Sequence, residues 1–408
     1  MRPHHDLRSP RSSALAGQLA LLLLPLLSLG ASCGSPEVPE GTECAEVHSA
    51  GGSSALSRAL EAAKPGDCVV LGNGTYEGHF KLPAGVTLIA GEDKLPLLQA
   101  EGTDDPVLQV EGGALSRVVG LEIVATGGQG IDVREGPASL ENLSVTAPGD
   151  IAVYLGCPAA GCSPEAVVEV VDSRLHGSQV GLWADGILVA TSGVLLEDNV
   201  DSSAIEGYGA LVTRGGRLEG NGDRIIGNGG MGLLADGAET TAELLDVEVS
   251  ENDGPGVWVQ GLRGSIGVPS LYVDGATSTI ASNAKAGIGS VDTVGIVVGT
   301  CIVRDTRPVP WPEGGGNVSQ VGDGIALLRG TAEVNLGAEA ALSSNDRAQV
   351  LVDQGGAGIV VGTAIVDPGA GRYGVVVQNT TGAVDINSTV QTDTPPTLGV
   401  DDGTQATP

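Results

Sequence analysis

The chain is built from short stretches in which aliphatic and polar residues alternate, and many of them open with Gly followed by aliphatic-x-aliphatic. Alternation with a period of two predicts strands with one buried face. The steps between strand starts range from 20 residues (Ile131 to Ile151) to 37 residues (Ile288 to Ile325). A repeat of this kind, without a helical period, is typical of a solenoid. The expected strand starts are Ile131, Ile151, Leu182, Leu211, Leu233, Val257, Ile288, Ile325, Val350 and Val375.

Four asparagines each stand five residues ahead of one of these strand starts. Asn tolerates the left-handed backbone conformation of a tight bend, and Asn stacked on Asn in successive coils passes hydrogen bonds along the axis. Between residues 245 and 249, alternation predicts that Leu245, Val247 and Val249 point inward. We expect one ladder of stacked side chains, formed by Asn228, Asn252, Asn283 and Asn345.

A different pattern precedes the first strands. Residues 53–63 open with Ser and place Leu56 and Leu60 one helical turn apart, which predicts a short amphipathic helix that ends before Pro65. A strand is expected at Cys68–Leu71. A helix with one apolar face, laid over the open end of a strand stack, shields that end from water and from other chains.

Two runs in this region, residues 59–67 and 71–76, closely resemble the N-terminal cap of right-handed parallel β-helix proteins of the pectin-lyase-like superfamily. The resemblance extends from about residue 53 to residue 390. It implies an all-β fold, a single-stranded right-handed parallel β-helix of roughly ten to twelve coils with a short capping helix. The cap motif is specific to this fold and not to any one activity.

Composition agrees with one elongated domain. The 65 Gly residues supply turns, and the aromatic residues are few, with five Tyr, three Trp and one Phe, as suits a narrow core of stacked aliphatic side chains. We assign residues 53–390 to the β-helix and residues 33–52 to a tether. Residues 391–408, rich in Thr, Pro, Asp and Gln, are expected to be a disordered tail.

The N-terminus has the pattern of a secretory signal. Three Arg precede an apolar run that ends in small residues before Cys33. The segment 1–32 resembles a bacterial lipoprotein signal, which implies that Cys33 is lipidated and anchors the protein to a membrane. Simple secretion is the alternative. The expected location is the bacterial cell envelope, lipid-anchored, or the exterior.

The mature chain is strongly acidic. Removing residues 1–32 takes away three Arg and one Asp, so 20 − 3 = 17 basic and 50 − 1 = 49 acidic residues remain, a net charge of −32. This excludes nucleic acid as a partner, because phosphate binding needs clustered Lys and Arg. It also disfavours polyanionic polysaccharides unless calcium intervenes. We expect a monomer whose partner is a neutral glycan or a surface protein.

Cysteine usage fits an oxidising compartment. We expect the pair Cys44–Cys68 to pin the N-terminal arm to the first strand, and the pair Cys157–Cys162 to close a small loop. Cys301 is expected to be buried. The five His do not cluster with the cysteines in the sequence, so no metal site is predicted.

Catalytic chemistry has little support. The lyase branch of the superfamily implies a Lys base, an Arg acid and acidic calcium ligands on one outward strand face. None of the four Lys (Lys64, Lys81, Lys94, Lys285) is expected on a mid-barrel strand beside an Arg. No catalytic residue is therefore carried over. No cofactor is expected, and calcium only if the protein acts on carbohydrate.

Three groups of side chains remain as candidates for a site. In a strand, Asp172, Arg174 and His176 share one outward face. There they bind an anion, transfer a proton as weak catalytic candidates, or form an ordinary solvated surface. A Pro- and Gly-rich protrusion, residues 304–317, carries Trp311, which either stacks on a sugar ring or packs against its own coil. Trp183 and Trp258 each follow an inward aliphatic residue of their strand, so both are expected to point outward. The binding candidates are Trp183, Trp258, Arg304, Arg307 and Trp311.

Two functions follow. The first is a non-catalytic β-helix lipoprotein of the cell envelope that binds a glycan or a protein at the surface, or has a structural role. The second is a polysaccharide lyase, epimerase or hydrolase that acts on an extracellular polysaccharide. Few Lys, sparse aromatics and heavy acidity favour the first.

Overall fold

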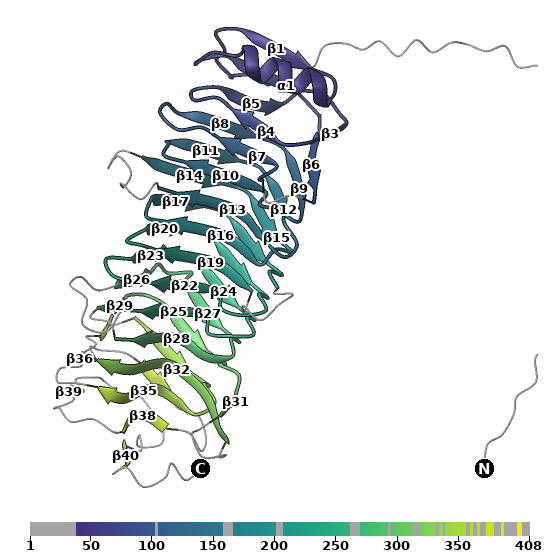
Figure 1. The fold of residues 1–408 in the computed structure, drawn as a ribbon. Helices are drawn as coiled ribbons and strands as arrows, with labels where there is room; N and C mark the ends of the chain where they lie inside the picture. The colour runs from purple at the N-terminus through teal and green to yellow at the C-terminus, as the bar shows by residue number, and fades with distance from the viewer. Residues whose placement is uncertain are drawn as a thin grey trace, which may run out of the picture. The chain divides into compact units, whose positions relative to one another are not determined.

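The computed structural model describes residues 38–408 except 103–104, 158–165, 201–206, 262–269, 293–294, 313–317, 331–333, 338, 356–359, 362–364, 368–372, 379–384, 387–397 and 402–408. The chain from residue 38 winds into a right-handed parallel β-helix of about 11 turns (Figure 1). Each turn contributes one strand to each of three parallel sheets, called A, B and C. The predicted fold class is confirmed. No helix among the described residues is long and apolar enough to span a membrane.

The strands of each sheet follow one another coil by coil. Sheet A contains β1 (Val47–Ala50), β2 (Cys68–Leu71), β5 (Thr87–Ala90), β8 (Ser116–Val119), β11 (Ala138–Glu141), β14 (Val167–Val171), β17 (Leu188–Ser192), β20 (Arg217–Asn221), β23 (Thr241–Leu245), β26 (Ser270–Asp274), β29 (Ile296–Val298) and β33 (Val334–Leu336). Sheet B contains β3 (Thr75–Glu77), β6 (Leu97–Glu101), β9 (Glu122–Thr126), β12 (Ser144–Thr146), β15 (Arg174–His176), β18 (Leu195–Glu197), β21 (Arg224–Ile226), β24 (Glu248–Ser250), β27 (Thr279–Ala281), β30 (Ile302–Arg304), β34 (Ala341–Ser343) and β37 (Ile365–Asp367).

Sheet C is the longest of the three. It contains β4 (Phe80–Leu82), β7 (Leu108–Val110), β10 (Ile131–Arg134), β13 (Ile151–Gly156), β16 (Val180–Asp185), β19 (Tyr208–Thr213), β22 (Leu233–Asp236), β25 (Val257–Gln260), β28 (Lys285–Val291), β32 (Val318–Gly330), β35 (Ala348–Gly355), β38 (Tyr373–Gln378) and β40 (Leu398–Asp401). The strand β31 (Val309–Pro312) pairs antiparallel with β32, and β36 (Val360–Val361) pairs with β39 (Asp385–Ile386).

The expected strand starts belong to sheet C, and most of them stand in one inward column. The two exceptions are Ile151 and Leu211, whose places in the column are taken by Val153 and Ala210. Since side chains alternate between faces, the shift of one residue turns Leu211 outward. The column runs through Leu108, Ile131, Val153, Leu182, Ala210, Leu233, Val257, Ile288, Ile325, Val350 and Val375.

The prediction for residues 245–249 is wrong at its first residue. Val247 and Val249 are buried, but Leu245 is 42% exposed. The chain turns a corner at Asp246, which has φ 51°, between β23 of sheet A and β24 of sheet B. The alternation therefore does not continue from Leu245 to Val247.

Buried asparagines stack in one column at the corner between sheets B and C. Asn228 Nδ2 donates to Asn252 Oδ1 over 2.8 Å, and Asn252 Nδ2 donates to Asn283 Oδ1 over 2.7 Å. The column also includes Asn199, which the sequence pattern missed and which donates to Asn228 over 2.9 Å. Thr306 takes the next position and donates its hydroxyl to Asn345.

The asparagines do not occupy the bend conformation itself, contrary to the reason given for them above. The residue with positive φ is the one before each Asn, for example Glu251 (60°) before Asn252 and Ser282 (57°) before Asn283. The Asn instead satisfies backbone groups: Asn252 Oδ1 also accepts the N–H of Asn228 over 3.0 Å. Its role is therefore to pair buried polar groups of adjacent coils.

The column of asparagines requires a column of glycines beside it. A Cβ at Gly232 would lie 2.5 Å from the carbonyl oxygen of Gly256 and 2.8 Å from Asn252 Nδ2, closer than real Cβ atoms approach. The same close approach to a column Asn occurs at Gly181, Gly209, Gly256 and Gly324. This explains why Gly precedes the inward aliphatic residue in these coils.

The N-terminal end is closed by α1 (Ser53–Ala62), which buries Leu56, Ala59 and Leu60. The strand β1 lies inside the segment assigned to the tether, so the β-helix begins earlier than expected; it pairs in parallel with β2. Cys44 and Cys68 form a disulfide with a Cα–Cα distance of 5.5 Å. At the other end, β40 falls within the predicted disordered tail and pairs with β38.

The remaining cysteines differ in environment. Cys157 takes part in a disulfide, and Cys162, its predicted partner, lies outside the described residues, as does Cys33. Cys301 is a free thiol, 2% exposed. Its burial raises the pKa of the thiol to about 12, so Cys301 is not a reactive nucleophile.

We predict that Asn252→Ala lowers the free energy of unfolding by roughly 3 kcal/mol or more, because the N–H and Nδ2 of Asn228 lose their buried acceptor. Urea titration followed by circular dichroism measures the loss. Asn73→Ala is the matched control, because the exposed Asn73 accepts one hydrogen bond from Leu95. An equal loss in both variants would contradict the role of the column.

A second buried polar group supports the corner between sheets A and B. Asp223 is 4% exposed and accepts hydrogen bonds from the Thr191 hydroxyl (2.5 Å) and from the N–H of Val194 (2.8 Å). Burial outweighs these hydrogen bonds and raises the pKa of Asp223 to about 6. The carboxylate is therefore ionised in a poorly solvated place at neutral pH.

Because the pKa of Asp223 is higher in the folded chain, its protonation stabilises the fold below pH ~4, and this contribution is lost as pH rises through about 6. We predict that Asp223→Asn gains stability relative to the unaltered protein between pH 4 and 7, by up to ~3 kcal/mol. Urea titrations of both proteins at each pH provide the difference. A difference that stays constant over this range would rule the effect out.

Candidate functional site

Sheet C carries two neighbouring rows of side chains on its outer face. The aromatic row alternates with the inward column and consists, in register, of Tyr154, Trp183, Leu211, Leu234 and Trp258. The polar row lies two residues further along each strand and includes Arg134, Asp185, Thr213, Asp236 and Gln260. Both rows face away from the core because side chains two residues apart share a face.

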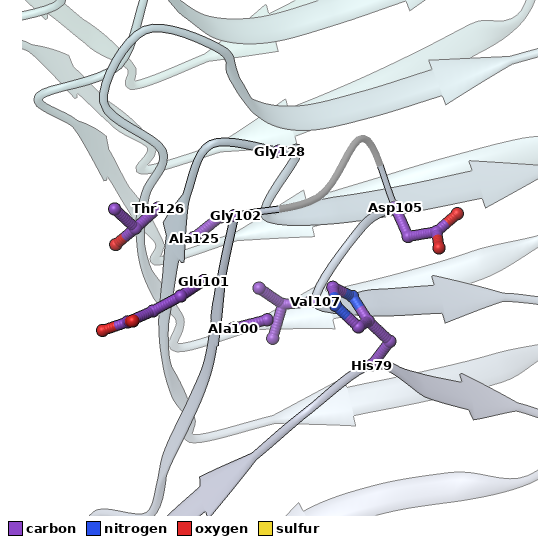
Figure 2. A pocket seen from close by; sticks show the side chains of 9 residues that line it. All are labelled: His79, Ala100, Glu101, Gly102, Asp105, Val107, Ala125, Thr126 and Gly128. Carbon is purple, nitrogen blue, oxygen red and sulfur yellow. The ribbon is translucent and has the colours of Figure 1, made fainter.

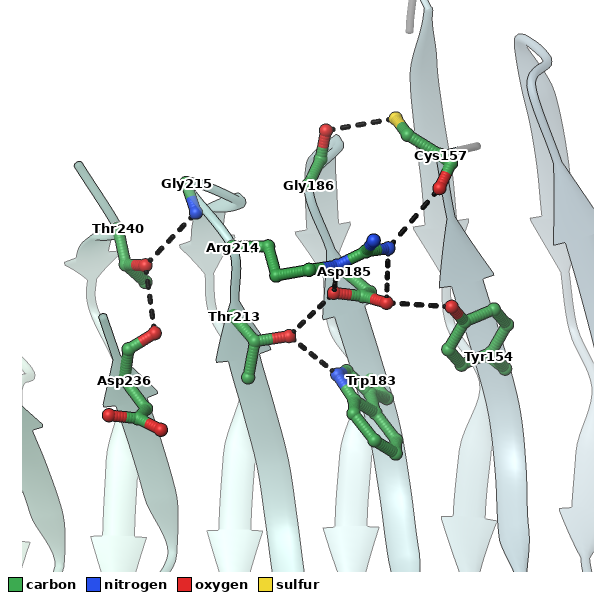
Figure 3. Close-up of polar contacts among 10 residues, drawn as sticks. All are labelled: Tyr154, Cys157, Trp183, Asp185, Gly186, Thr213, Arg214, Gly215, Asp236 and Thr240. Atoms are coloured by element: carbon green, nitrogen blue, oxygen red, sulfur yellow. Dashed lines mark hydrogen bonds and ion pairs between the residues drawn. The ribbon is translucent and has the colours of Figure 1, made fainter. Parts of the chain in front are cut away.

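The rings of the aromatic row are held by hydrogen bonds that they donate to the polar row. The hydroxyl of Tyr154 donates to Asp185 Oδ2 over 2.7 Å, and Trp183 Nε1 donates to the Thr213 hydroxyl over 2.8 Å (Figure 3). Trp258 Nε1 donates to Gln260 over 3.2 Å. All three rings are half-buried, so each keeps part of its surface open to solvent.

Neighbouring positions give these rings their room. Tyr154 and Trp183 meet edge to face, with centroids 5.6 Å apart and planes at 81°. A Cβ at Gly289 would lie 2.1 Å from a ring carbon of Trp258, so this indole extends over the glycine of the next coil. The aromatic surface is therefore built by close packing and is preorganised.

Asp185 is the centre of the polar contacts. Its carboxylate forms a two-pronged ion pair with Arg214 and also accepts the hydroxyls of Tyr154 and Thr213 (Figure 3). Arg214 reaches further, to the carbonyl oxygen of Cys157, over 3.2 Å. Figure 3 shows that these contacts cross three successive coils.

The electrostatics follow from this pairing. Burial acts to raise the pKa of Asp185, but the hydrogen bonds from Arg214, Tyr154 and Thr213 outweigh it and hold that pKa below its ordinary value. Burial, together with the Asp185 carboxylate, raises the pKa of Tyr154 to about 12. At neutral pH the site therefore contains an ionised carboxylate and a protonated phenol.

Asp132 lies beside Tyr154, one coil towards the N-terminus. Its side chain is fully buried and pairs through Oδ2 with Arg134 over 2.7 Å. Among the described residues, its Oδ1 atom has no hydrogen-bond partner. A buried carboxylate oxygen without a donor is unfavourable, so this position favours a group that can donate a hydrogen bond.

The structure does not place the three residues of the predicted anion site in one row. Asp172 lies at a corner with φ 46°, before β15 begins at Arg174. Arg174 pairs with Glu197 over 2.5 Å. Burial, aided by the charge of Arg174, lowers the pKa of His176, so its ring is neutral at neutral pH. These contacts leave no shared anion site.

The predicted protrusion also differs from a sugar-binding loop in its contacts. Arg304 pairs with Asp305 over 2.5 Å. Arg307 donates to the carbonyl oxygens of Ser282 (2.7 Å) and Asn252 (2.8 Å), so its guanidinium ties turns of neighbouring coils together. Trp311 lies in β31, where it pairs with Ser319 of the antiparallel strand β32.

Sequence reasoning found Trp183 and Trp258 but missed the residues that hold them. Asp185, Arg214 and Tyr154 belong to no local sequence motif. Aligning the coils on the inward column would have placed Tyr154 next to Trp183, and Asp185 next to Thr213.

A small pocket lies apart from these rows, near the N-terminal coils (Figure 2). Its lining includes His79, Glu101, Val107 and Thr126, and it encloses no space that a water-sized sphere can enter. The ring of His79 lies 2.9 Å from the carbonyl oxygen of Pro106. Ligand pockets usually have several hundred Å³, so this pocket is not the candidate site.

No family model matches the sequence, and no curated protein has a similar sequence. Solved structures are similar in fold. A double mutant of the periplasmic alginate epimerase AlgG has a TM-score of 0.51 and 11% identity, covering 85% of this chain and 84% of that chain. The A-module of the mannuronan C-5 epimerase AlgE6 of Azotobacter vinelandii has a TM-score of 0.43 and 14% identity, covering 86% and 93%. An alginate lyase from a Paenibacillus species has 0.36 and 14%, covering 85% and 98%. At such identities the first similarity supports the parallel β-helix fold alone.

Proposed function

We propose that this protein binds a glycan along the outer face of sheet C without cleaving it. The observation that carries the proposal is the set of three half-exposed rings, Tyr154, Trp183 and Trp258, each fixed by a hydrogen bond to the polar row. Ring surfaces of this kind stack on the apolar faces of sugars, and their polar tips remain satisfied. The polar row supplies donors and acceptors for hydroxyl groups.

Preorganisation favours binding to a chain-like ligand. The rings and the polar row are already ordered, so less conformational entropy is lost when a ligand binds. The rows run across successive coils, so a polysaccharide lying along the axis contacts several of them at once. The net charge of −32 on the chain without residues 1–32, and the pairing of Arg134 and Arg214 with carboxylates, favour a neutral glycan over an acidic one.

The titratable groups favour binding over catalysis. A general base works best when its pKa lies near the working pH. The pKa of Asp185 is held below its ordinary value, and Tyr154 has a pKa of about 12. Neither group is poised to take a proton at neutral pH.

The alternative is a polysaccharide lyase or epimerase. Structural neighbours are mostly proteins of these classes, although their similarity supports only the fold. The specific observation in its favour is Asp132, whose unpartnered Oδ1 lies beside the Tyr154 side of the aromatic row. That oxygen has a free lone pair to accept a proton, but it is buried, so a substrate reaches it only if the paired side chain of Arg134 moves aside.

The proposal includes a place in the cell envelope. The signal-like segment before Cys33 supports export, and lipidation of Cys33 would anchor the protein to a membrane. The similarity to a periplasmic protein agrees with an envelope or secreted location. A surface protein remains the other partner class consistent with the acidic charge.

We predict that Trp183→Ala and Trp258→Ala each weaken glycan binding about tenfold, because each removes one stacking surface. Affinity electrophoresis against neutral glucans, mannans and galactans, with alginate and pectate for comparison, measures the effect. Tyr272→Ala is the matched control, since Tyr272 is an exposed ring on sheet A. Equal effects of all three substitutions, or no binding to any glycan, would contradict the proposal.

A second prediction separates binding from catalysis. We expect no unsaturated product, measured by ultraviolet absorbance, when the protein is incubated with alginate, pectate or chondroitin in the presence of calcium. NMR spectra of the treated alginate should show an unchanged uronate composition. Activity that is lost in Asp132→Asn and Tyr154→Phe, but kept in Tyr272→Phe, would establish the enzyme alternative instead.

A further inference from the structure

A cluster of potential metal ligands lies at the N-terminal end of the β-helix, away from the outer rows of sheet C. Glu46 and His48 stand two residues apart at the start of β1, and Asp67 immediately precedes β2. The parallel pairing of Val47 with Cys68 brings Glu46 opposite Asp67. His48 Nε2 lies 3.3 Å from Asp67 Oδ2, and one ligand atom from each of the three residues lies within 4.8 Å of the other two.

Within the described residues, the only charged partner of the carboxylates in this cluster is its own member His48, which pairs with Asp67. Asp67 is 5% exposed, and the N–H of Lys64 donates to its carboxylate over 2.8 Å. Among the described residues, no Lys or Arg forms an ion pair with Glu46 or Asp67. Like charges placed opposite each other on paired strands destabilise a sheet, so this position favours a cation.

We propose that Glu46, His48 and Asp67 form a site for a divalent zinc ion that fastens β1 to β2. Two metal–ligand bonds of ~2.1 Å that span the 3.3 Å between His48 Nε2 and Asp67 Oδ2 enclose an angle of about 105°, near the tetrahedral value that zinc prefers. One imidazole with two carboxylates is a donor set for zinc, whereas calcium takes six or more oxygens.

The three ligands differ in how firmly they are placed. Asp67 is buried and His48 is half-buried. The neighbouring disulfide between Cys44 and Cys68 ties the segment before β1 to β2. Glu46 is exposed, so its side chain is free to rotate onto the ion. The fourth coordination position faces solvent and takes a water molecule. The ion would therefore reinforce the same strand junction as the disulfide.

Competition between the protein and a chromophoric chelator for Zn²⁺ tests this site. The unaltered protein should take up one Zn²⁺ at this site, and His48→Ala should lose it. Glu46→Gln should weaken the affinity by more than about tenfold, because even the loss of a group that only supports a metal ligand costs about 10–100-fold. His79→Ala is the matched control, because His79 lies outside the cluster, and should bind as the unaltered protein does.

Thermal unfolding provides an independent readout. Zn²⁺ should raise the melting temperature of the unaltered protein and of His79→Ala, but not that of His48→Ala. Unchanged Zn²⁺ affinity in His48→Ala would overturn the proposal. If His48→Ala does not fold, Glu46→Gln decides, because its side chain is exposed: an affinity equal to that of the unaltered protein would then overturn the site.

Discussion

The structure depends on buried hydrogen bonds that run along the axis at one corner of each coil. Asn228, Asn252 and Asn283 pass these bonds from coil to coil and also satisfy backbone N–H groups that have no partner in their own strands. The column leaves no space for a Cβ at the adjoining glycines, such as Gly232 and Gly256. Side-chain pairing and glycine placement therefore act together to keep successive coils in register.

Register in turn determines what the outer face of sheet C presents. A shift of one residue would exchange the inward and outward sets of a strand. Trp183 would then point into the narrow core, and the aliphatic Leu182 would face solvent. Because the coils are held in phase, Tyr154 meets Trp183, and Asp185 lies between the hydroxyls of Tyr154 and Thr213. The candidate binding face is thus a consequence of how the coils stack.

The sequence predicted the repeat, the fold class and most of the inward column, because a five-residue spacing between Asn and strand is visible at Asn228, Asn252 and Asn283. It missed Asn199, which belongs to the same column but precedes Ala210 by 11 residues (210 − 199). The additional residues in that turn hide the spacing, and the start of the strand was misplaced by one residue for the same reason.

The contacts of the site were harder to predict than its aromatic residues. The alternation of side chains along a single strand is enough to predict that Trp183 and Trp258 point outward. Arg214 reaches Asp185 on the preceding coil, 29 residues earlier, and such a contact has no local sequence signal. The row expected from Asp172 to His176 failed because a corner at Asp172 interrupts the strand. Asn142 and Asp246 have the same positive φ at the equivalent corner of other coils, a recurrence that appears only when the coils are aligned.

The most direct test of the account is a crystal structure of the protein with the oligosaccharide that it binds most tightly. Sugar rings stacked on Trp183 and Trp258, with hydroxyl groups hydrogen-bonded to the polar row and no bond cleaved, are the expected result. An oligosaccharide bound on another face, with Trp183 and Trp258 left uncovered, would contradict the account.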